Sequence, residues 1–368
     1  MKKMTVKFYQ NACLIFLILC SYGHLSQAAQ TGILNIKEVG ISNYAFSVKV
    51  ANGNDSLTLM AGDDLNFANA VNYGDSFDVK IIEQDHRQRC MVVNGQGVMS
   101  ATTQPLILAC KNRNLISAGL YVACAINESA GIDCFGSDNY LKTEDVPAGS
   151  YQEVAVGAQH ACALKTDNSV VCWGRNSEGQ TDAPTVGHFI SVVASHHGSC
   201  ALDDNHLLQC WGNITNTPYP VPSGNFWDVD ISYFHGCAIE DDLTAVCWGS
   251  DSKGRATVPT GLKAFDVAVS DYFSCAINKE NRESQCWGKN QFGDGNPITW
   301  DMADLDLGYF HGCGLSSGGG TVLCWGLGDG YEPYLTGSFT QISAGYFFTC
   351  GIREDYSVAC TGDANPLE

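Results

Sequence analysis

Short apolar stretches separated by turn residues recur along the last two thirds of the chain. Residues 154–174 read VAVGAQHACALKTDNSVVCWG. Here three apolar segments of strand length, 153–156, 161–164 and 170–173, are followed by a loop rich in Gly, Asn and Pro. This spacing predicts β-strands, because an amphipathic helix needs a 3.6-residue period over a longer window. The pattern therefore indicates an all-β protein.

The same pattern occurs seven times, and each repeat unit contains two cysteines. The first cysteines of successive units are 37 or 38 residues apart, and such a fixed period is typical of a repeat architecture. We number the units one to seven in chain order. Their cysteines are Cys124 and Cys134, Cys162 and Cys172, Cys200 and Cys210, Cys237 and Cys247, Cys275 and Cys286, Cys313 and Cys324, and Cys350 and Cys360.

A β-hairpin explains the short distance between the two cysteines of a unit. If Cys162 lies opposite Cys172, then Leu164 lies opposite Val170, and Asn168 takes the left-handed conformation that a three-residue turn requires. Opposed residues in an antiparallel pair have Cα atoms roughly 4.5–5.5 Å apart, within reach of a disulfide. The sequence predicts one disulfide in each unit. Units five and six have one extra residue, which a turn or bulge can absorb.

A lone hairpin is marginal in water, so the units must bury their faces against one another. They can stack as an open solenoid or as a closed ring. The ring is favoured because propellers of four to eight blades are common and no polar capping repeat is visible at either end. We therefore expect a seven-bladed β-propeller of three-stranded repeats over residues 111–368.

The repeats resemble those of the regulator of chromosome condensation family. The short period is most similar to secreted propeller-type β-lactamase inhibitors, a resemblance that implies a propeller which binds a protein. The Trp-Gly pair of the motif is replaced by Phe135-Gly136 in unit one and by Thr361-Gly362 in unit seven. The matching residues of unit two are Gly157, His160, Ala163-Leu164, Val170-Val171, Trp173-Gly174, Asn176 and Gly179-Gln180.

Residues 29–110 lack the repeat. Alternating runs at 45–50 and 56–60 predict a small β-sandwich. Residues 71–110 resemble a domain family of exported bacterial proteins, which implies an immunoglobulin-like spacer and a Cys90–Cys110 disulfide. The residues that carry this resemblance are Gln88, Cys90, Val92-Val93-Asn94-Gly95-Gln96-Gly97 and Cys110.

The N-terminus predicts a signal peptide over residues 1–28, with three lysines before a nine-residue apolar core at 12–20 and small residues before the cleavage site. A lipoprotein signal ending at Cys20 is the alternative. Cleavage after Ala28 removes Cys13 and Cys20 and leaves sixteen cysteines, which favours disulfides in an oxidising compartment. We expect an exported bacterial protein, extracellular, periplasmic or at the cell surface, that is not inserted in a membrane.

The net charge of the chain restricts the classes of partner that it can bind. Acidic residues outnumber basic ones 39 to 20, and the net charge of −19 argues against nucleic acid and anionic membranes as partners.

Motifs for metal binding and catalysis are absent from the sequence. It contains no Cys-x2-Cys pair, the spacing that would indicate zinc. It also contains no nucleophile elbow, zincin helix or phosphate loop, which would indicate an enzyme. We therefore expect no cofactor, no metal and no catalytic activity. The alternative that the sequence leaves open is a catalytic pair of acidic residues in the channel of the propeller.

Aromatic residues gather in the loop before each first cysteine, chiefly in units four to seven. Rotational repetition places these loops on one face, which we expect to bind a protein. Histidines in the same loops are interpreted as packing residues, because Phe273 and Phe348 replace them elsewhere. A carbohydrate-binding or carbohydrate-cleaving propeller is the alternative; nucleotide exchange or chromatin binding rests on the family name alone. The candidate binding residues are Tyr233, Phe234, Tyr272, Tyr309, Phe310, Tyr346 and Phe347.

Overall fold

The computed structural model describes residues 31–39, 48–59, 64–84, 87–136, 145–214, 221–289, 299–317, 320–326, 335–362 and 366–367. The predicted signal peptide lies outside these residues. Within them the regular structure is β-strand, apart from one short 3-10 helix, η1 (Ser252–Gly254). No helical segment in these ranges has the length and apolar character needed to cross a membrane.

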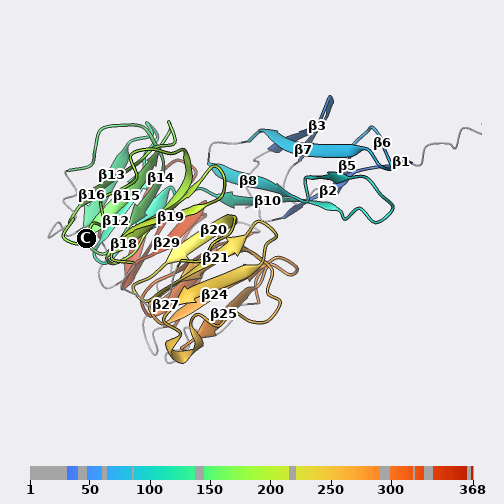
Figure 1. Ribbon diagram of the computed structural model, residues 1–368. Coiled ribbons are helices and arrows are strands. Elements are labelled where there is room, and N and C mark those ends of the chain that lie inside the picture. The colour runs from blue at the N-terminus through green and yellow to red at the C-terminus, as the bar shows by residue number, and fades with distance from the viewer. Residues whose placement is uncertain are drawn as a thin grey trace, which may run out of the picture.

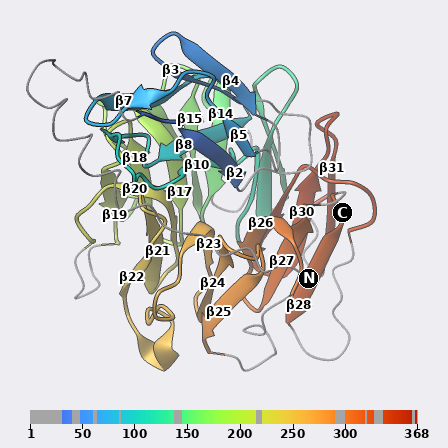
Figure 2. The ribbon, with the colours of Figure 1, turned by 90° about the vertical axis from the view of Figure 1, so that its right-hand side faces the viewer.

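Seven three-stranded antiparallel sheets follow one another, one for each repeat unit (Figures 1 and 2). This confirms the predicted repetition of three-stranded sheets. Units one to four contain β11 (Ile116–Ala118), β12 (Val122–Ile126), β13 (Ile132–Gly136); β14 (Tyr151–Val156), β15 (His160–Lys165), β16 (Val170–Gly174); β17 (Phe189–Ala194), β18 (Gly198–Asp203), β19 (Leu208–Gly212); and β20 (Phe226–Ile231), β21 (His235–Glu240), β22 (Ala245–Gly249). Units five to seven contain β23 (Ala264–Val269), β24 (Phe273–Asn278), β25 (Ser284–Gly288); β26 (Met302–Leu307), β27 (His311–Ser316), β28 (Val322–Gly326); and β29 (Gln341–Ala344), β30 (Phe348–Ile352), β31 (Val358–Gly362).

The hairpin of each unit has the predicted register. In unit two Cys162 pairs with Cys172 and Leu164 with Val170, and Asn168 has φ 67°. The extra residue of units five and six lies in the turn, since their cysteines remain directly opposed. All seven units contain the predicted disulfide, with Cα atoms 4.0 Å apart.

Neighbouring sheets bury apolar side chains against each other. Leu164 of unit two, for example, shares a core with Phe189 and Val192 of unit three. The first and last sheets also meet: Ile116 and Phe348 belong to one core cluster, and β11 contacts both β29 and β30. Units one and seven are therefore neighbours in space.

The N-terminal residues form two four-stranded sheets and a two-stranded one. The four-stranded sheets share a core that includes Ile36 and Leu108 from one and Val50 and Val79 from the other. The Cys90–Cys110 disulfide is present, with Cα atoms 4.1 Å apart. The strand orders are β5 (Asp64–Asn66), β2 (Asn35–Val39), β10 (Leu106–Asn112), β8 (Gln88–Val93); β4 (Asp55–Leu59), β3 (Val48–Asn52), β7 (Ser76–Glu83), β9 (Gln96–Val98); and β1 (Thr31–Gly32), β6 (Val71–Asn72).

Strand β10 joins the N-terminal sheets to the repeats (Figure 1). Side chains alternate along a strand, so Leu106 and Leu108 enter the N-terminal core. Ile107 and Ala109 instead pack against a cluster from units four and five that includes Trp227. The strand continues to residue 112, beyond the predicted domain boundary at 110.

Candidate functional site

Two positions on or next to the innermost strand of each unit define two rings of side chains. All seven members of one ring and one member of the other line a cavity of about 90 Å³ to which all seven sheets contribute. The basal ring, nine residues before the first cysteine, consists of Leu115, Glu153, Ser191, Asp228, Asp266, Asp304 and Gln341. The funnel ring, two residues later, consists of Ser117, Ala155, Val193, Asp230, Ala268, Asp306 and Ser343.

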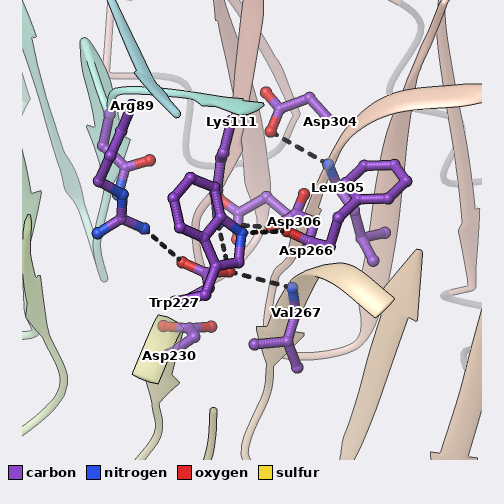
Figure 3. A network of polar contacts seen from close by, with 12 residues as sticks. Arg89, Lys111, Trp227, Asp230, Asp266, Val267, Asp304, Leu305 and Asp306 are labelled. Carbon is purple, nitrogen blue, oxygen red and sulfur yellow. Dashed lines mark hydrogen bonds and ion pairs between the residues drawn. The ribbon is translucent and has the colours of Figure 1, made fainter. Parts of the chain in front are cut away.

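Lys111 of β10 places its ammonium group in the basal ring (Figure 3). Its Nζ lies 2.8 Å from Asp228 Oδ2 and 2.5 Å from Asp266 Oδ1. Arg89 of β8 adds a second ion pair, with its Nη2 3.2 Å from Asp228 Oδ1, and its guanidinium lies 4.8 Å from the centre of the Trp227 ring. The N-terminal sheets thus supply cations to buried carboxylates of units four and five.

Burial governs the protonation of these groups. It raises the pKa of Asp266 to about 6 and, helped by the charge of Asp266, raises the pKa of Asp304 to about 8. Burial alone would lower the pKa of Lys111, but the charges of Asp228 and Asp266 more than reverse this effect. Lys111 therefore stays cationic, while Asp304 is mostly protonated near neutral pH.

Side chains of both rings also accept hydrogen bonds from the backbone of the next unit. In the funnel ring, the Val269 amide donates to Asp230 Oδ2 at 2.7 Å and the Ala344 amide donates to Asp306 Oδ2 at 2.8 Å. In the basal ring, the Val267 amide donates to Asp228 and the Leu115 amide to Gln341. These contacts hold adjacent sheets in register, including the first and last.

Beyond the funnel ring, the sheets open into a cavity of about 150 Å³, which we call the funnel. Asp230 and Asp306 at its floor are partly exposed, whereas Asp228 and Asp266 of the basal ring are buried. In six of the seven units, the residue four positions before the first cysteine lines this cavity. The wall residues at this position are Leu120, Ala158, His196, Asp271, Tyr309 and Tyr346.

The funnel gathers carboxyl groups in a partly enclosed space. Burial and the charge of Asp306 raise the pKa of Asp230 well above its ordinary value, and burial raises the pKa values of Asp306 and Asp271. Burial lowers the pKa of His196, whose Nδ1 lies 3.9 Å from Asp271 Oδ1. A cation that entered the funnel would stabilise the charged forms of these carboxyl groups.

Five of the predicted aromatic residues form one cluster. The rings of Tyr309 and Tyr346 stack with centroids 4.0 Å apart, and Tyr272 Oη lies 2.6 Å from Tyr309 Oη. Phe310 lies 5.9 Å from Tyr272 and 6.0 Å from Phe347, between centroids. All five side chains are partly buried, so the cluster is a preformed surface.

Tyr233 and Phe234 form a second cluster with two histidines. The Tyr233 ring lies 4.6 Å from Phe234, 5.5 Å from His196 and 5.2 Å from His197, between centroids. Tyr233 is 47% exposed, the most accessible of the predicted aromatic residues. The structure thus places both clusters in the loops that surround the funnel; their role in partner binding stays a prediction.

Three histidines directly after these loops, each the first residue of the middle strand of its unit, are buried between sheets. Each Nε2 lies within hydrogen-bond distance of a hydroxyl oxygen in the next unit, which supports the interpretation of these histidines as packing residues. Within the described ranges, no group of three or more His, Cys, Asp or Glu residues could hold a metal ion. The pairs are His160 with Ser199 at 2.8 Å, His235 with Ser274 at 2.7 Å, and His311 with Thr349 at 2.8 Å.

Sequence reasoning missed Lys111, Arg89 and the acidic members of the rings. One signal was available: in units four and six, Asp-Val-Asp and Asp-Leu-Asp interrupt apolar strands at the same distance from the first cysteine. A charge in a buried strand is costly unless it has a partner, so these residues indicate a site. Nothing in the sequence pattern links them to Lys111.

Comparison with known proteins agrees with this architecture. Residues 151–180 match the family model of the regulator of chromosome condensation (RCC1) repeat. The CRINKLY WD40 ectodomain of the receptor kinase ACR4 from Arabidopsis thaliana is similar, with TM-score 0.60 and 24% identity over 69% of this chain and 96% of that one. The described chain is thus an RCC1-like repeat propeller.

Two further solved structures share the fold. The ectodomain of the receptor kinase CR4 from Physcomitrella patens has TM-score 0.58 and 25% identity, over 67% of this chain and 72% of that one. Prp20p from Saccharomyces cerevisiae has TM-score 0.53 and 12% identity, over 63% of this chain and 80% of that one.

Proposed function

We propose that this chain is an exported, non-catalytic scaffold that binds another protein through the funnel and the aromatic clusters around it. The observation that carries the proposal is the preformed aromatic surface, from Tyr272 to Tyr346, beside an open acidic cavity. Tyr and other aromatic side chains dominate the energetics of protein interfaces because they bury much apolar area with little loss of rotamer entropy.

In this proposal the seven sheets are the seven blades of a closed propeller, and the two four-stranded sheets form a small immunoglobulin-like sandwich. The sandwich covers the basal end of the propeller through β8 and β10, where Lys111 and Arg89 enter the basal ring. The funnel end is then the one left for a partner.

Export is supported by the eight disulfides, since oxidising compartments let them persist. Two of the similar structures are receptor-kinase ectodomains, which is consistent with an exported protein. The proposal of a bacterial source rests on the resemblance of the N-terminal segment to a domain family of exported bacterial proteins.

A protein partner and a non-catalytic role have separate support. The reported structure of Prp20p describes its binding to Gsp1p and histones, so a propeller of this fold can serve as a protein-binding scaffold. The carboxylates of Asp230 and Asp306 are engaged by backbone amides of the next unit, which suits a structural role better than proton transfer.

The test is capture of a partner by the mature protein from the exported fraction of its source, followed by affinity measurements on variants. We expect Tyr233→Ala or Tyr346→Ala to weaken binding by about 2 kcal/mol or more, as interface hot spots do. Tyr73→Ala, which removes a 38%-exposed tyrosine from the N-terminal sheets, is the matched control. Unchanged affinity in both funnel variants would place the site elsewhere, and glycan binding without a protein partner would favour the carbohydrate alternative.

A further inference from the structure

The chain itself shows how a cation occupies the acidic core of the repeats. The Lys111 ammonium enters the basal ring from β10 and lies between Asp228 and Asp266 of adjacent units. Its alkyl stem comes from outside the seven sheets, and only the charged end reaches the carboxylates. A lysine side chain therefore fits this ring as an inserted group.

The funnel ring also has two carboxylates, one step along the strands of units four and six, whereas unit five has Ala268 at this position. Asp230 lies two residues after Asp228, and Asp306 two residues after Asp304. Both residues are partly exposed and line the funnel. Among the described residues, neither has an ion-pair partner within 4.0 Å. Both accept hydrogen bonds from backbone amides, and Asp306 also accepts one from the Ser343 hydroxyl.

The wall of the funnel is suited to the same chemistry. Tyr309 and Tyr346 line it with their stacked rings, and aromatic rings attract cations at distances up to about 6 Å. Elsewhere the chain already uses this contact: the Arg255 guanidinium lies 4.6 Å from the Phe234 ring, and Lys289 Nζ lies 4.6 Å from the Tyr272 ring.

We infer that the funnel binds one lysine or arginine side chain, presented by a protruding loop of a partner protein, with the cation between Asp230 and Asp306 and its stem against Tyr309 and Tyr346. This inference rests on the proposed protein-binding function of the funnel face and specifies the chemistry of the partner. The partner's cation pairs with carboxylates of units four and six, as the Lys111 ammonium pairs with carboxylates of units four and five.

The size of the funnel favours a side chain over a free small molecule. Its volume of about 150 Å³ is below the roughly 300–1,000 Å³ of pockets that enclose drug-sized ligands. A side chain tethered to a partner can use so small a cavity because the aromatic clusters around it bind the rest of the partner surface. The two carboxylates also lack a third metal-ligating group among the described residues, which favours an organic cation over a metal ion.

The experiment selects disulfide-cyclised peptides from a displayed library on the mature protein. We expect the enriched peptides to share one lysine or arginine at the tip of the loop. Synthetic versions in which norleucine replaces that residue should bind at least about tenfold more weakly, since a buried charge pair is lost. On the D230N/D306N variant, the charged and norleucine peptides should bind alike.

The matched control is E128Q/D204N, which removes two exposed carboxylates from hairpin turns outside the funnel and should leave the preference unchanged. Circular dichroism of each variant checks that it folds. Peptides that need Tyr346 but show no preference for a cation would overturn this inference and leave the proposed function intact, whereas failure to recover any Tyr346-dependent peptide would count against both. Stabilisation by calcium chloride alone, lost in D230N/D306N, would identify a metal site and overturn the inference.

Discussion

His160 Nε2 lies 2.8 Å from the Ser199 hydroxyl oxygen, and this contact between units two and three recurs at every second junction. Where phenylalanine replaces the histidine, the residue of the next unit that corresponds to Ser199 has no hydroxyl group. For Phe273 of unit five this residue is Gly312 of unit six, and for Phe348 of unit seven it is Ala123 of unit one. Neighbouring units are therefore matched in pairs, so the order of the repeats matters to the packing.

The matched pairs predict a strong coupling between His235 and Ser274. Ser274→Ala should cost about 1–3 kcal/mol of unfolding free energy, because His235 Nε2 loses its partner in a buried site. His235→Phe alone should cost a similar amount by crowding Ser274. The double variant copies the Phe348–Ala123 junction and should recover at least about 1 kcal/mol relative to the sum of the single changes.

Urea denaturation of the four proteins of this cycle measures the coupling. Ser129→Ala, at an exposed turn, is the control and should change stability little. Strictly additive effects of the two changes would show that the contact contributes nothing specific.

The buried histidines predict a loss of stability in acid. Burial lowers the pKa of His160 to about 4, of His235 to about 3 and of His311 to about 4. The unfolded chain therefore binds more protons, and stability falls as the pH drops from about 6.5 toward these values. Between pH 7 and 5, H235F/S274A should lose about 1–2 kcal/mol less than the parent. Equal losses in the two proteins would contradict the assignment.

Removal of the Lys111 charge should destabilise the propeller more than removal of a surface lysine. Lys111→Met leaves Asp228 and Asp266 without their shared cation in a buried site, which should cost about 3–5 kcal/mol. Lys80→Met breaks an exposed pair with Asp78 and should change the unfolding free energy little. Adding Asp266→Asn to Lys111→Met should restore part of the lost unfolding free energy. Denaturant titration at pH 7 measures this, and the assignment is wrong if the second substitution restores none of the loss.

The disulfides of the units should act independently of one another. Cys162→Ser/Cys172→Ser opens one loop with a sequence separation of 10 residues, and chain entropy gives about 2.5–3 kcal/mol for such a closure. The thermal midpoint of this variant should fall while the other pairs remain intact. Peptide mapping without reduction checks the pairing; free thiols or links between units would refute it.

Within each unit, the sequence by itself determined most of the structure. The spacing of Cys162 and Cys172, the alternation of their strands and the left-handed Asn168 are local features, because side-chain period and turn length set the register of a hairpin. The N-terminal disulfide was also predictable, but only through the resemblance that links Cys90 to Cys110. The aromatic loops were predictable as a group for the same reason as the hairpins, since they repeat at fixed positions.

Only the tertiary structure decided which side chains the charged residues contact. Strand alternation places Lys111 on the face of β10 opposite Leu108, but alternation says nothing about what that face contacts. Its partner Asp228 is 117 residues away in sequence, and the two meet because the N-terminal sheets pack against units four and five. The acidic funnel likewise exists only once the inner strands of all seven units converge, since each strand contributes no more than a few of its side chains.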